Sequence, residues 1–179
     1  MKHGAIIGVS DHGGWAILVT AAGDGRLLDR RRVELVDDDL PKLPHHHDAQ
    51  ALPLDQAVDL IERVRVSAER HAALALDAVA ASVPAPVVGV ALRACQPLPA
   101  TIAERLSNYR AQNVADWVMY RRAIAAGAES RGWNVHWYDA NKMFDQASET
   151  MRQSVGPPWT RDHKIAMAAA LAAARPEVS

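Results

Sequence analysis

The chain has 179 residues, of which 49% are hydrophobic and 23% are charged, and its formal net charge is −1 at pH 7. These values are typical of a single globular domain that covers residues 1–179, and they exclude a chain too polar to fold. They also exclude attraction of polyanions by an overall positive charge, so any binding of nucleic acid must rely on a local surface.

Three antiparallel strands are predicted at the start of the chain. Apolar residues fill 5–9 and 15–20, and Asp11-His12-Gly13-Gly14 between them is typical of a tight turn. The turn at 22–25 contains two glycines and leads into a third strand over 26–36. Apolar and polar residues alternate near the end of this strand, which indicates an edge strand with one face in solvent.

Residues 37–54 are predicted to be a long irregular connector, and its length of about 18 residues is unusual for a compact domain. It contains the run His45-His46-His47-Asp48. In an extended loop, His45 and His47 would face the same ion, and imidazole favours Zn²⁺ over Mg²⁺. Two interpretations stay open: a solvated loop whose histidines only titrate, or a loop that supplies site histidines or zinc ligands.

Helices and strands alternate through the rest of the chain. Asp55 is the expected N-cap of the next helix, and Thr101 with Glu104 forms the expected capping box of another. Gly132 is the expected C-terminal stop of the second long helix. The predicted elements are a helix over 55–81, a buried strand over 87–92, a short helix over 101–110, a helix over 114–131, a strand over 134–138 and a helix over 162–174.

The remaining sequence features concern the cellular compartment of the protein. Cys95 is the only cysteine, so no disulfide can form within the chain, and we expect this thiol to be buried and inert. The first residues lack the apolar stretch of a secretion signal, which predicts a cytoplasmic protein. The longest uncharged apolar window, 78–92, is too short to cross a bilayer, so no membrane role is expected.

This order of elements is that of the ribonuclease H-like fold, and within it the chain resembles the RuvC-type Holliday-junction resolvases. The opening Ile6-Ile7-Gly8-Val9-Ser10-Asp11-His12-Gly13 resembles their first strand, in which an apolar strand with a glycine ends at an Asp. Residues 135–147 resemble their fifth strand with its basic turn, and 162–173 resemble their alanine-rich last helix. The resemblance implies an α/β fold with a mixed five-stranded sheet, three antiparallel strands followed by two parallel ones, flanked by helices.

The resemblance also implies a nuclease site with two divalent ions, Mg²⁺ or Mn²⁺, held by four acidic groups so that the ions bridge the attacking and leaving oxygens. Here Ser10 stands at the place of the first Asp, with Asp11 one step along and pointing to the other face if the strand continues. The fourth strand contains no acid and ends with Arg93, and on the last helix only Asp162 remains, with His163 beside it. The acidic site is therefore expected to be degenerate.

Candidate site residues follow from these placements. The catalytic candidates are Asp11, His12, Asp162 and His163. The metal-ligand candidates are Asp11, Asp162, His45 and His47. The nucleic-acid-binding candidates are Arg93, Arg110, Arg121 and Arg122. Arg93 is a candidate phosphate contact because it ends a strand. The other three lie in a stretch that mixes arginines with aromatic residues, as in proteins that bind single strands and junctions.

Each candidate also has a structural interpretation. Asp and Gly favour turns without a catalytic role, and an Asp in the first turn stabilises a helix. The arginines of the helix over 114–131 equally fit a solvated basic face. The aromatic residues Trp117, Trp133, Trp137 and Tyr138 are expected in the core or covering the sheet.

Two functions remain open from the sequence. The first is an atypical RuvC-like domain that binds or processes DNA or RNA; if it is an enzyme, it is a metal-dependent, nuclease-like hydrolase. The alternative is a catalytically inactive scaffold, a homodimer, that binds a protein partner. The degenerate acidic site and the near-zero net charge favour the alternative, whereas the order of elements favours the first.

Overall fold

The computed structural model describes residues 4–140 and 155–175. Its centre is a five-stranded sheet of order β3-β2-β1-β4-β5. The strands are β1 (Ala5–His12), β2 (Trp15–Ala21), β3 (Leu27–Glu34), β4 (Val87–Arg93) and β5 (Asn134–Tyr138). The first three are antiparallel, β4 is parallel to β1, and β5 is parallel to β4. The mixed sheet predicted from the sequence is confirmed.

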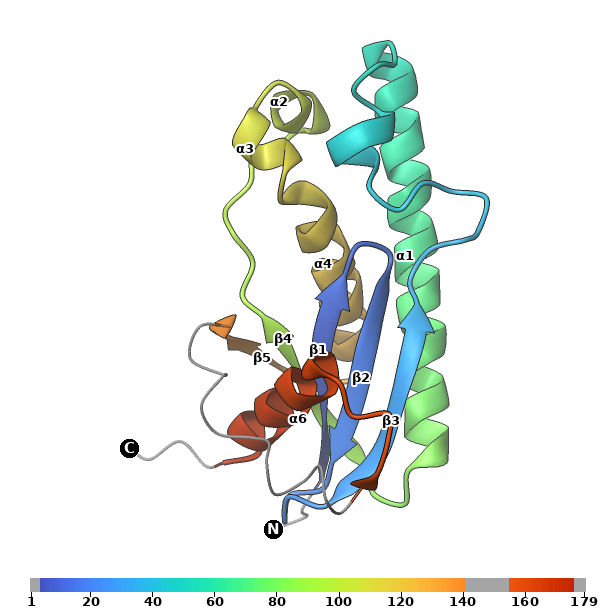
Figure 1. The fold of residues 1–179 in the computed structure, drawn as a ribbon. Helices are drawn as coiled ribbons and strands as arrows, with labels where there is room; N and C mark the ends of the chain where they lie inside the picture. Colours follow the sequence, from blue (N-terminus) through green and yellow to red (C-terminus); the bar gives the residue numbers. More distant parts are fainter. Residues whose placement is uncertain (1–3, 141–154, 176–179) are drawn as a thin grey trace.

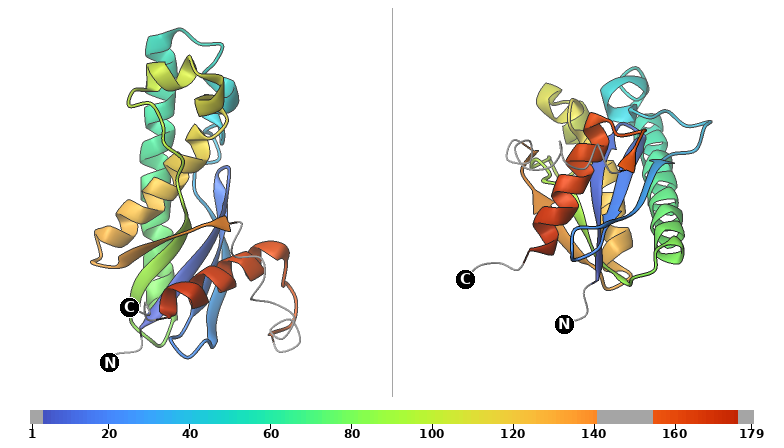
Figure 2. Two further views of the ribbon diagram at one scale, coloured as in Figure 1. Left: turned by 90° about the vertical axis from the view of Figure 1, so that its left-hand side faces the viewer. Right: turned by 60° about the horizontal axis from the view of Figure 1, so that its bottom comes forward.

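Helices cover both faces of the sheet. They are η1 (Pro44–Asp48), α1 (Leu54–Ser82), α2 (Ile102–Leu106), α3 (Tyr109–Gln112), α4 (Ala115–Glu129) and α6 (Arg161–Ala174). The helices α1 and α4 lie against one face, and α6 crosses the other (Figure 1; Figure 2). The elements α2, α3 and η1 lie beyond the carboxyl end of β1 (Figure 1). Loops and short helices therefore surround the end of the sheet where candidate side chains gather.

Three expectations about the helices and the connector differ from the structure. Pro53, with extended dihedral angles, is the N-cap of α1, and Asp55 lies in the first turn instead. The helix expected over 101–110 is two short helices, because Asn108 caps the second by accepting a hydrogen bond from the backbone N–H of Ala111. The connector 37–54 contains η1, a turn of π-helix, rather than a continuous irregular loop.

The first strand is longer than predicted, and this decides which face each candidate residue points to. Pairing with β2 continues to His12↔Trp15, so only Gly13 and Gly14 form the turn. Because side chains alternate along a strand, Ser10 and His12 share one face and Asp11 points to the other. The sequence-based placement of Asp11 on the opposite face from Ser10 agrees with this geometry.

Two apolar layers hold the fold together. One lies between the sheet and the helices α1 and α4, and the other lies between the sheet and α6. In the second layer Gly8 allows direct contact between backbones, since a Cβ atom at Gly8 would lie 1.7 Å from the carbonyl oxygen of Ala166. The small residue therefore sets the depth at which α6 packs on β1.

Although α1 has 29 residues, neither it nor any other helix in the described ranges has an apolar stretch long enough to cross a membrane.

Candidate functional site at the carboxyl end of β1

Three side chains meet where β1 ends and α6 begins. Ser10 Oγ donates a hydrogen bond of 2.7 Å to Asp162 Oδ1, and His12 Nε2 lies 2.8 Å from the same oxygen. Asp162 lies in the first turn of α6, where the helix dipole also stabilises a negative charge. The side chains of His12 and Asp162 are 40% and 26% exposed, so this cluster is open to a ligand.

The charge of Asp162 follows from its surroundings. Partial burial raises the pKa of this carboxyl. The hydrogen bonds from His12 and Ser10 lower the pKa by more than burial raises it, so the net shift is downward. Asp162 is therefore ionised at neutral pH. Because a carboxylate only accepts hydrogen bonds, Nε2 of His12 must carry the proton that the two groups share.

Stacking on the ring of Trp15 fixes the orientation of the His12 ring. The rings of His12 and Trp15 are parallel, with centroids 4.0 Å apart and an interplanar angle of 5°. The guanidinium of Arg32 lies 3.8 Å from the centroid of the Trp15 ring, in a cation–π contact. Residues of the strands β2 and β3 thus hold the imidazole in one orientation.

The candidate His163 lies beside this cluster but is directed into the structure. It is buried, and its Nδ1 accepts a hydrogen bond of 3.2 Å from the backbone N–H of Thr160 and lies 2.8 Å from the Thr160 hydroxyl. Burial, and then the positive charge of Arg30, lower the pKa of His163, so the ring is neutral at pH 7. The structure gives His163 the role of closing the first turn of α6.

Arg30 anchors the segment that leads into α6. Its Nη1 donates to the carbonyl oxygens of residues 156 and 158 at 2.9 and 2.8 Å, and its Nη2 donates to those of residues 155 and 157 at 3.2 Å each. An arginine at the edge strand β3 therefore fixes the start of the helix that carries Asp162. Four carbonyl contacts of this kind could not be recognised from the local sequence.

Asp11 and Arg121 form a buried ion pair on the other face of the sheet. Arg121 Nε donates to Asp11 Oδ2 at 2.7 Å, and the two side chains are 7% and 2% exposed. Burial raises the pKa of Asp11, and the charge of Arg121 opposes this shift. The structure thus does not bring Asp11 together with Asp162. Arg121 is buried rather than at the surface, so it is not placed to contact nucleic acid.

The histidine run also has a different role from the one expected of a metal loop. Asp116 and His45 are both buried, and Asp116 Oδ1 lies 2.8 Å from His45 Nδ1. The same carboxylate accepts hydrogen bonds of 3.1 Å from the backbone N–H groups of His45 and His46. Because η1 is helical, His45 points inward while His47 is exposed, so the two do not face one ion.

The structure reveals Asp116 as the residue that anchors η1, and this role was not predicted from the sequence. A signal for it exists, since Asp116 shares one helical face with Tyr120 and Ala123, which are both buried. An acid on the apolar face of a helix requires a buried partner. The sequence did not identify His45 as that partner, because the two residues are 71 positions apart.

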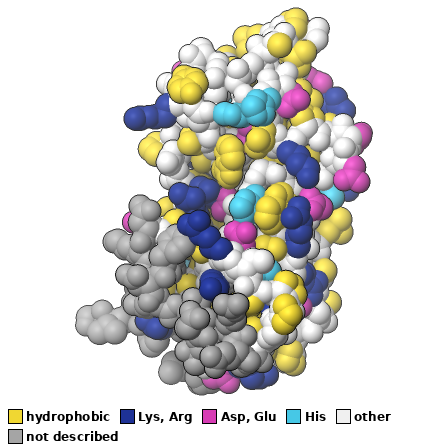
Figure 3. Space-filling view, in the orientation of Figure 1, with side chains coloured by type: hydrophobic (Ala, Val, Ile, Leu, Met, Phe, Trp, Pro, Cys, Tyr) yellow, Lys and Arg dark blue, Asp and Glu magenta, His cyan; other side chains and the backbone are white. Residues whose placement is uncertain are grey.

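The four candidate arginines do not form one exposed surface, although Arg93 and the buried Arg121 line the same small pocket. Arg93 is the exposed last residue of β4. Because β4 runs parallel to β1, Arg93 and His12 lie at the same end of the sheet. Arg110 is exposed on α3, and Arg122 is exposed on α4, where it lines a cavity against α1. Figure 3 shows Lys and Arg side chains spread across the middle of one face, together with histidines and acidic side chains. Of the four, Arg93 lies at the same end of the sheet as the cluster of Ser10, His12 and Asp162.

Only some of the aromatic residues that were expected in the core are buried there. Tyr138 is buried, and its hydroxyl donates to the carbonyl oxygen of Val9 at 2.7 Å. Trp137 is 48% exposed, because it lies on the edge strand β5 and no described helix covers it. Trp117 is partly exposed and lines a small pocket with Arg93. Cys95 is only partly buried, and this burial raises the pKa of its thiol.

A two-ion site does not fit the residues described at this edge. Within 4–140 and 155–175, no three His, Cys, Asp or Glu side chains are grouped so that they could hold one metal ion. Oδ1 of Asp162 is already engaged by Ser10 and His12. At the carboxyl end of β4 stands Arg93, which brings a positive charge and no carboxylate. The donor set favours hydrogen bonding to a ligand over coordination of a pair of cations.

Comparison with known proteins agrees on the fold alone. No family model matches the chain, and no curated protein matches it in sequence. Among solved structures, T. thermophilus RuvC in complex with Holliday junction substrate is similar, with a TM-score of 0.51 and 15% identity over 94% of this chain and 91% of that one. A second Thermus thermophilus RuvC structure aligns with a TM-score of 0.47 and 13% identity over 93% of this chain and 91% of that one. The chain has a RuvC-like ribonuclease H fold.

Proposed function

We propose that the protein binds nucleic acid at the carboxyl ends of β1 and β4. The observation that carries this proposal is the open Ser10, His12 and Asp162 cluster on the same sheet edge as Arg93, whose guanidinium has no hydrogen-bond or ion-pair partner among the described residues. The likeness in fold to a RuvC structure that contains a Holliday junction supports nucleic-acid binding in general. That support is an analogy of fold and adds no residue roles.

Arg93 supplies the charge that such binding needs. A guanidinium can donate two parallel hydrogen bonds to one phosphate, and its positive charge persists at any pH of interest. His12 adds a donor or acceptor that is held in place by Asp162 and Trp15. Since the net charge of the chain is −1, binding depends on this local surface and decreases steeply as salt increases.

Cleavage through two divalent ions forms no part of this proposal. Of the carboxylates expected to hold Mg²⁺ or Mn²⁺, Asp162 lies at this edge, whereas Asp11 is paired with Arg121 on the other face. A zinc ion on His45 and His47 is equally unsupported, because His45 is buried against Asp116. The proposed activity is therefore binding that does not require a divalent ion.

Replacing Arg93 by glutamine tests the role of this edge. We expect Arg93→Gln to weaken binding of a labelled four-way DNA junction about tenfold and to reduce the slope of log affinity against log salt by about one, because one phosphate contact is lost. The measurement is fluorescence anisotropy over a series of salt concentrations that begins at low salt, with EDTA and again with Mg²⁺. Single-stranded DNA is titrated in parallel, since the choice between branched and single-stranded ligands is open.

Arg26→Gln is the matched control, because Arg26 is exposed on the turn before β3, at the opposite end of the sheet. This variant removes the same charge and should bind like the wild type. Equal losses of affinity in both variants would show a nonspecific charge effect, and absence of binding by the wild-type protein at low salt would refute the proposal.

A protein scaffold is the second candidate function, and one surface favours it. Val66 and Leu74 are 54% and 59% exposed, and their spacing of eight residues places them on one side of α1. Such a surface would suit a partner protein or a second copy of the chain. Sedimentation analysis of the wild type and of Val66→Lys tests this alternative: a dimer that dissociates in the variant would support it, and a wild-type monomer would argue against self-association.

A further inference from the structure

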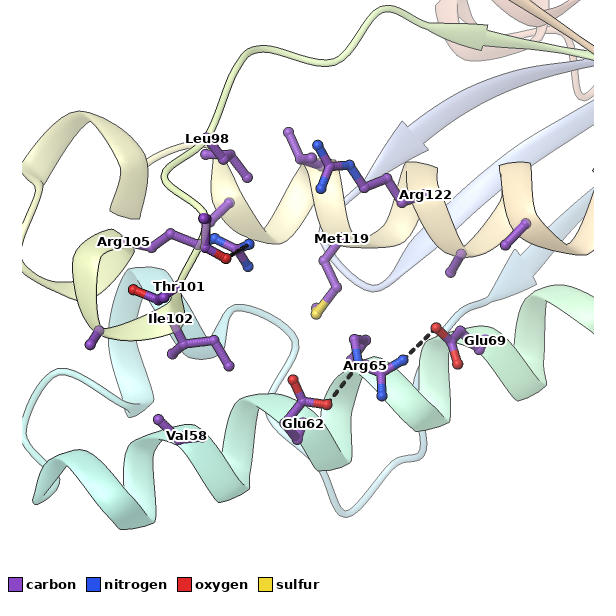
Figure 4. A pocket seen from close by; sticks show the side chains of 16 residues that line it. Val58, Glu62, Arg65, Glu69, Leu98, Thr101, Ile102, Arg105, Met119 and Arg122 are labelled. Atoms are coloured by element: carbon purple, nitrogen blue, oxygen red, sulfur yellow. Dashed lines mark hydrogen bonds and ion pairs between the residues drawn. The ribbon is translucent and has the colours of Figure 1, made fainter.

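A second site lies away from the sheet edge, in the space between α1, α2 and α4 (Figure 4). The cavity has a volume of ≈ 610 Å³ and is lined by α1, by the loop after β4, by α2 and by α4. This volume falls within the range of about 300–1,000 Å³ that small-molecule sites occupy. None of the residues at the carboxyl end of β1 lines it.

One wall of the cavity has its charges paired. On α1, Arg65 donates to Glu62 at 2.7 Å and to Glu69 at 2.5 Å. Figure 4 shows these three side chains along the α1 wall, joined by the two dashed interactions. The acidic groups on this side are therefore satisfied and leave one negative charge in excess.

The opposite wall carries two guanidinium groups without a carboxylate partner. Arg105 donates to the carbonyl oxygens of Pro99 and Ala100 at 2.8 and 3.0 Å. Arg122 has no hydrogen-bond or ion-pair partner within the described part of the chain, although it lines the same cavity. Burial, and then the charge of Arg122, lower the pKa of Arg105. Three arginines against two glutamates leave the lining with one net positive charge.

Apolar side chains supply the rest of the lining. Leu98, Ile102 and Met119 are each only partly buried by the protein itself and border the cavity. In Figure 4, Met119 extends from α4 toward α1, between the charged groups of the two walls. A ligand that covered these three side chains while pairing with a guanidinium would bury apolar area and neutralise the excess charge together.

We propose that this cavity binds a small amphipathic monoanion. Its carboxylate, sulfonate or phosphate-ester group pairs with Arg122 and the nearby Arg105, and its aliphatic or aromatic body lies against Leu98, Ile102 and Met119. The single net positive charge favours a monoanion, and the paired glutamates on α1 disfavour a dianion. This site is separate from the proposed nucleic-acid site, because its lining includes none of Ser10, His12, Arg93 and Asp162.

Anilinonaphthalene sulfonate, a fluorescent monoanion with an aromatic body, tests the site on the intact chain without DNA. We expect saturable binding at one site per chain, competed by octanoate. Arg122→Gln should weaken it at least tenfold, whereas Arg26→Gln and Arg93→Gln should leave it unchanged. N-phenylnaphthylamine, which has a similar body but no charge, should bind the wild type and Arg122→Gln equally, so that loss of the charge pair is distinguished from loss of the cavity.

Several outcomes would overturn the proposal. Equal affinity of wild type and Arg122→Gln for the sulfonate would show that no anion pairs with this arginine. Displacement of the bound sulfonate by junction DNA would assign the surface to nucleic acid instead. A wild-type dimer that becomes monomeric in Arg122→Gln would show that a second copy of the chain covers the cavity. A second variant, Ala126→Phe, narrows the exposed rim of the cavity and should also reduce sulfonate binding.

Discussion

Arg121→Gln is expected to lower the free energy of unfolding by about 3–5 kcal/mol, since it leaves the carboxylate of Asp11 buried without a counterion. For a chain of this size, that loss corresponds to a fall in Tm of about 6–20 °C. Denaturant unfolding monitored by circular dichroism measures the change. The size of the effect follows from burial, because exposed ion pairs contribute only about 0–1 kcal/mol.

The pH dependence of this loss identifies its cause. In the folded protein, burial raises the pKa of Asp11 above 3.8, its usual value in an unfolded chain. The folded protein therefore binds a proton on Asp11 more readily than the unfolded chain does. Stability linked to Asp11 is therefore greatest below pH 3.8 and falls as pH rises through the folded pKa. Because the charge of Arg121 lowers the pKa of Asp11, removing Arg121 raises that pKa further and increases the loss of stability between low and neutral pH. The deficit of Arg121→Gln relative to the wild type should be complete at pH 7 and shrink toward pH 4.

Two variants serve as controls. Arg122→Gln, at the adjacent and exposed position, should change the free energy of unfolding by no more than about 0.5 kcal/mol. The double variant Asp11→Asn/Arg121→Gln should recover most of the loss, because no charge is then left unpaired. Equal stability losses in Arg121→Gln and Arg122→Gln would contradict the assignment of the buried pair.

Gly8→Ala is expected to destabilise the protein by about 3 kcal/mol or more, at or beyond the upper end for overpacked cores. The added Cβ would lie 1.7 Å from the carbonyl oxygen of Ala166 and 2.9 Å from the backbone N of Ala170, so α6 must move away from β1. Movement of α6 would also separate Asp162 from Ser10 and His12. Thermal unfolding and junction binding should therefore be impaired in the same variant.

Gly127→Ala makes the same substitution where the neighbour can move. Its Cβ would meet Cδ1 of Leu76 at 3.0 Å, the flexible end of a side chain, and alanine favours the helix by about 1 kcal/mol over glycine. We expect a change smaller than about 1 kcal/mol and normal binding. If Gly8→Ala were as mild as Gly127→Ala, the close packing of α6 on β1 would be refuted.

The sheet and its helices could be predicted because their signals are local. Alternation and apolar runs located all five strands, and helical spacing located α1, α4 and α6 to within a few residues. The ends were less accurate where one residue decides them. Asn108 divides a predicted helix into α2 and α3, and the pairing of His12 with Trp15 extends β1 beyond the predicted turn.

The site could be predicted only in part, because its contacts join residues far apart in the sequence. The alternation of side chains along β1 placed Ser10 and Asp11 on different faces, and Asp162 was recognised at the start of the last helix. The pairing of Arg121 with Asp11 spans 110 positions, and that of His45 with Asp116 spans 71. No local pattern shows which of two adjacent arginines points inward, so Arg121 was assigned to the surface although only Arg122 lies there.

Hydrogen exchange of the protein with and without a four-way DNA junction, at low salt in EDTA, tests the location of binding most directly. We expect protection of backbone amides at the end of β1 and the following turn, at the end of β4 after Arg93, and in the first turn of α6. Protection confined to the outer face of α1, or none at DNA concentrations that saturate binding, would contradict nucleic-acid binding at the carboxyl ends of β1 and β4.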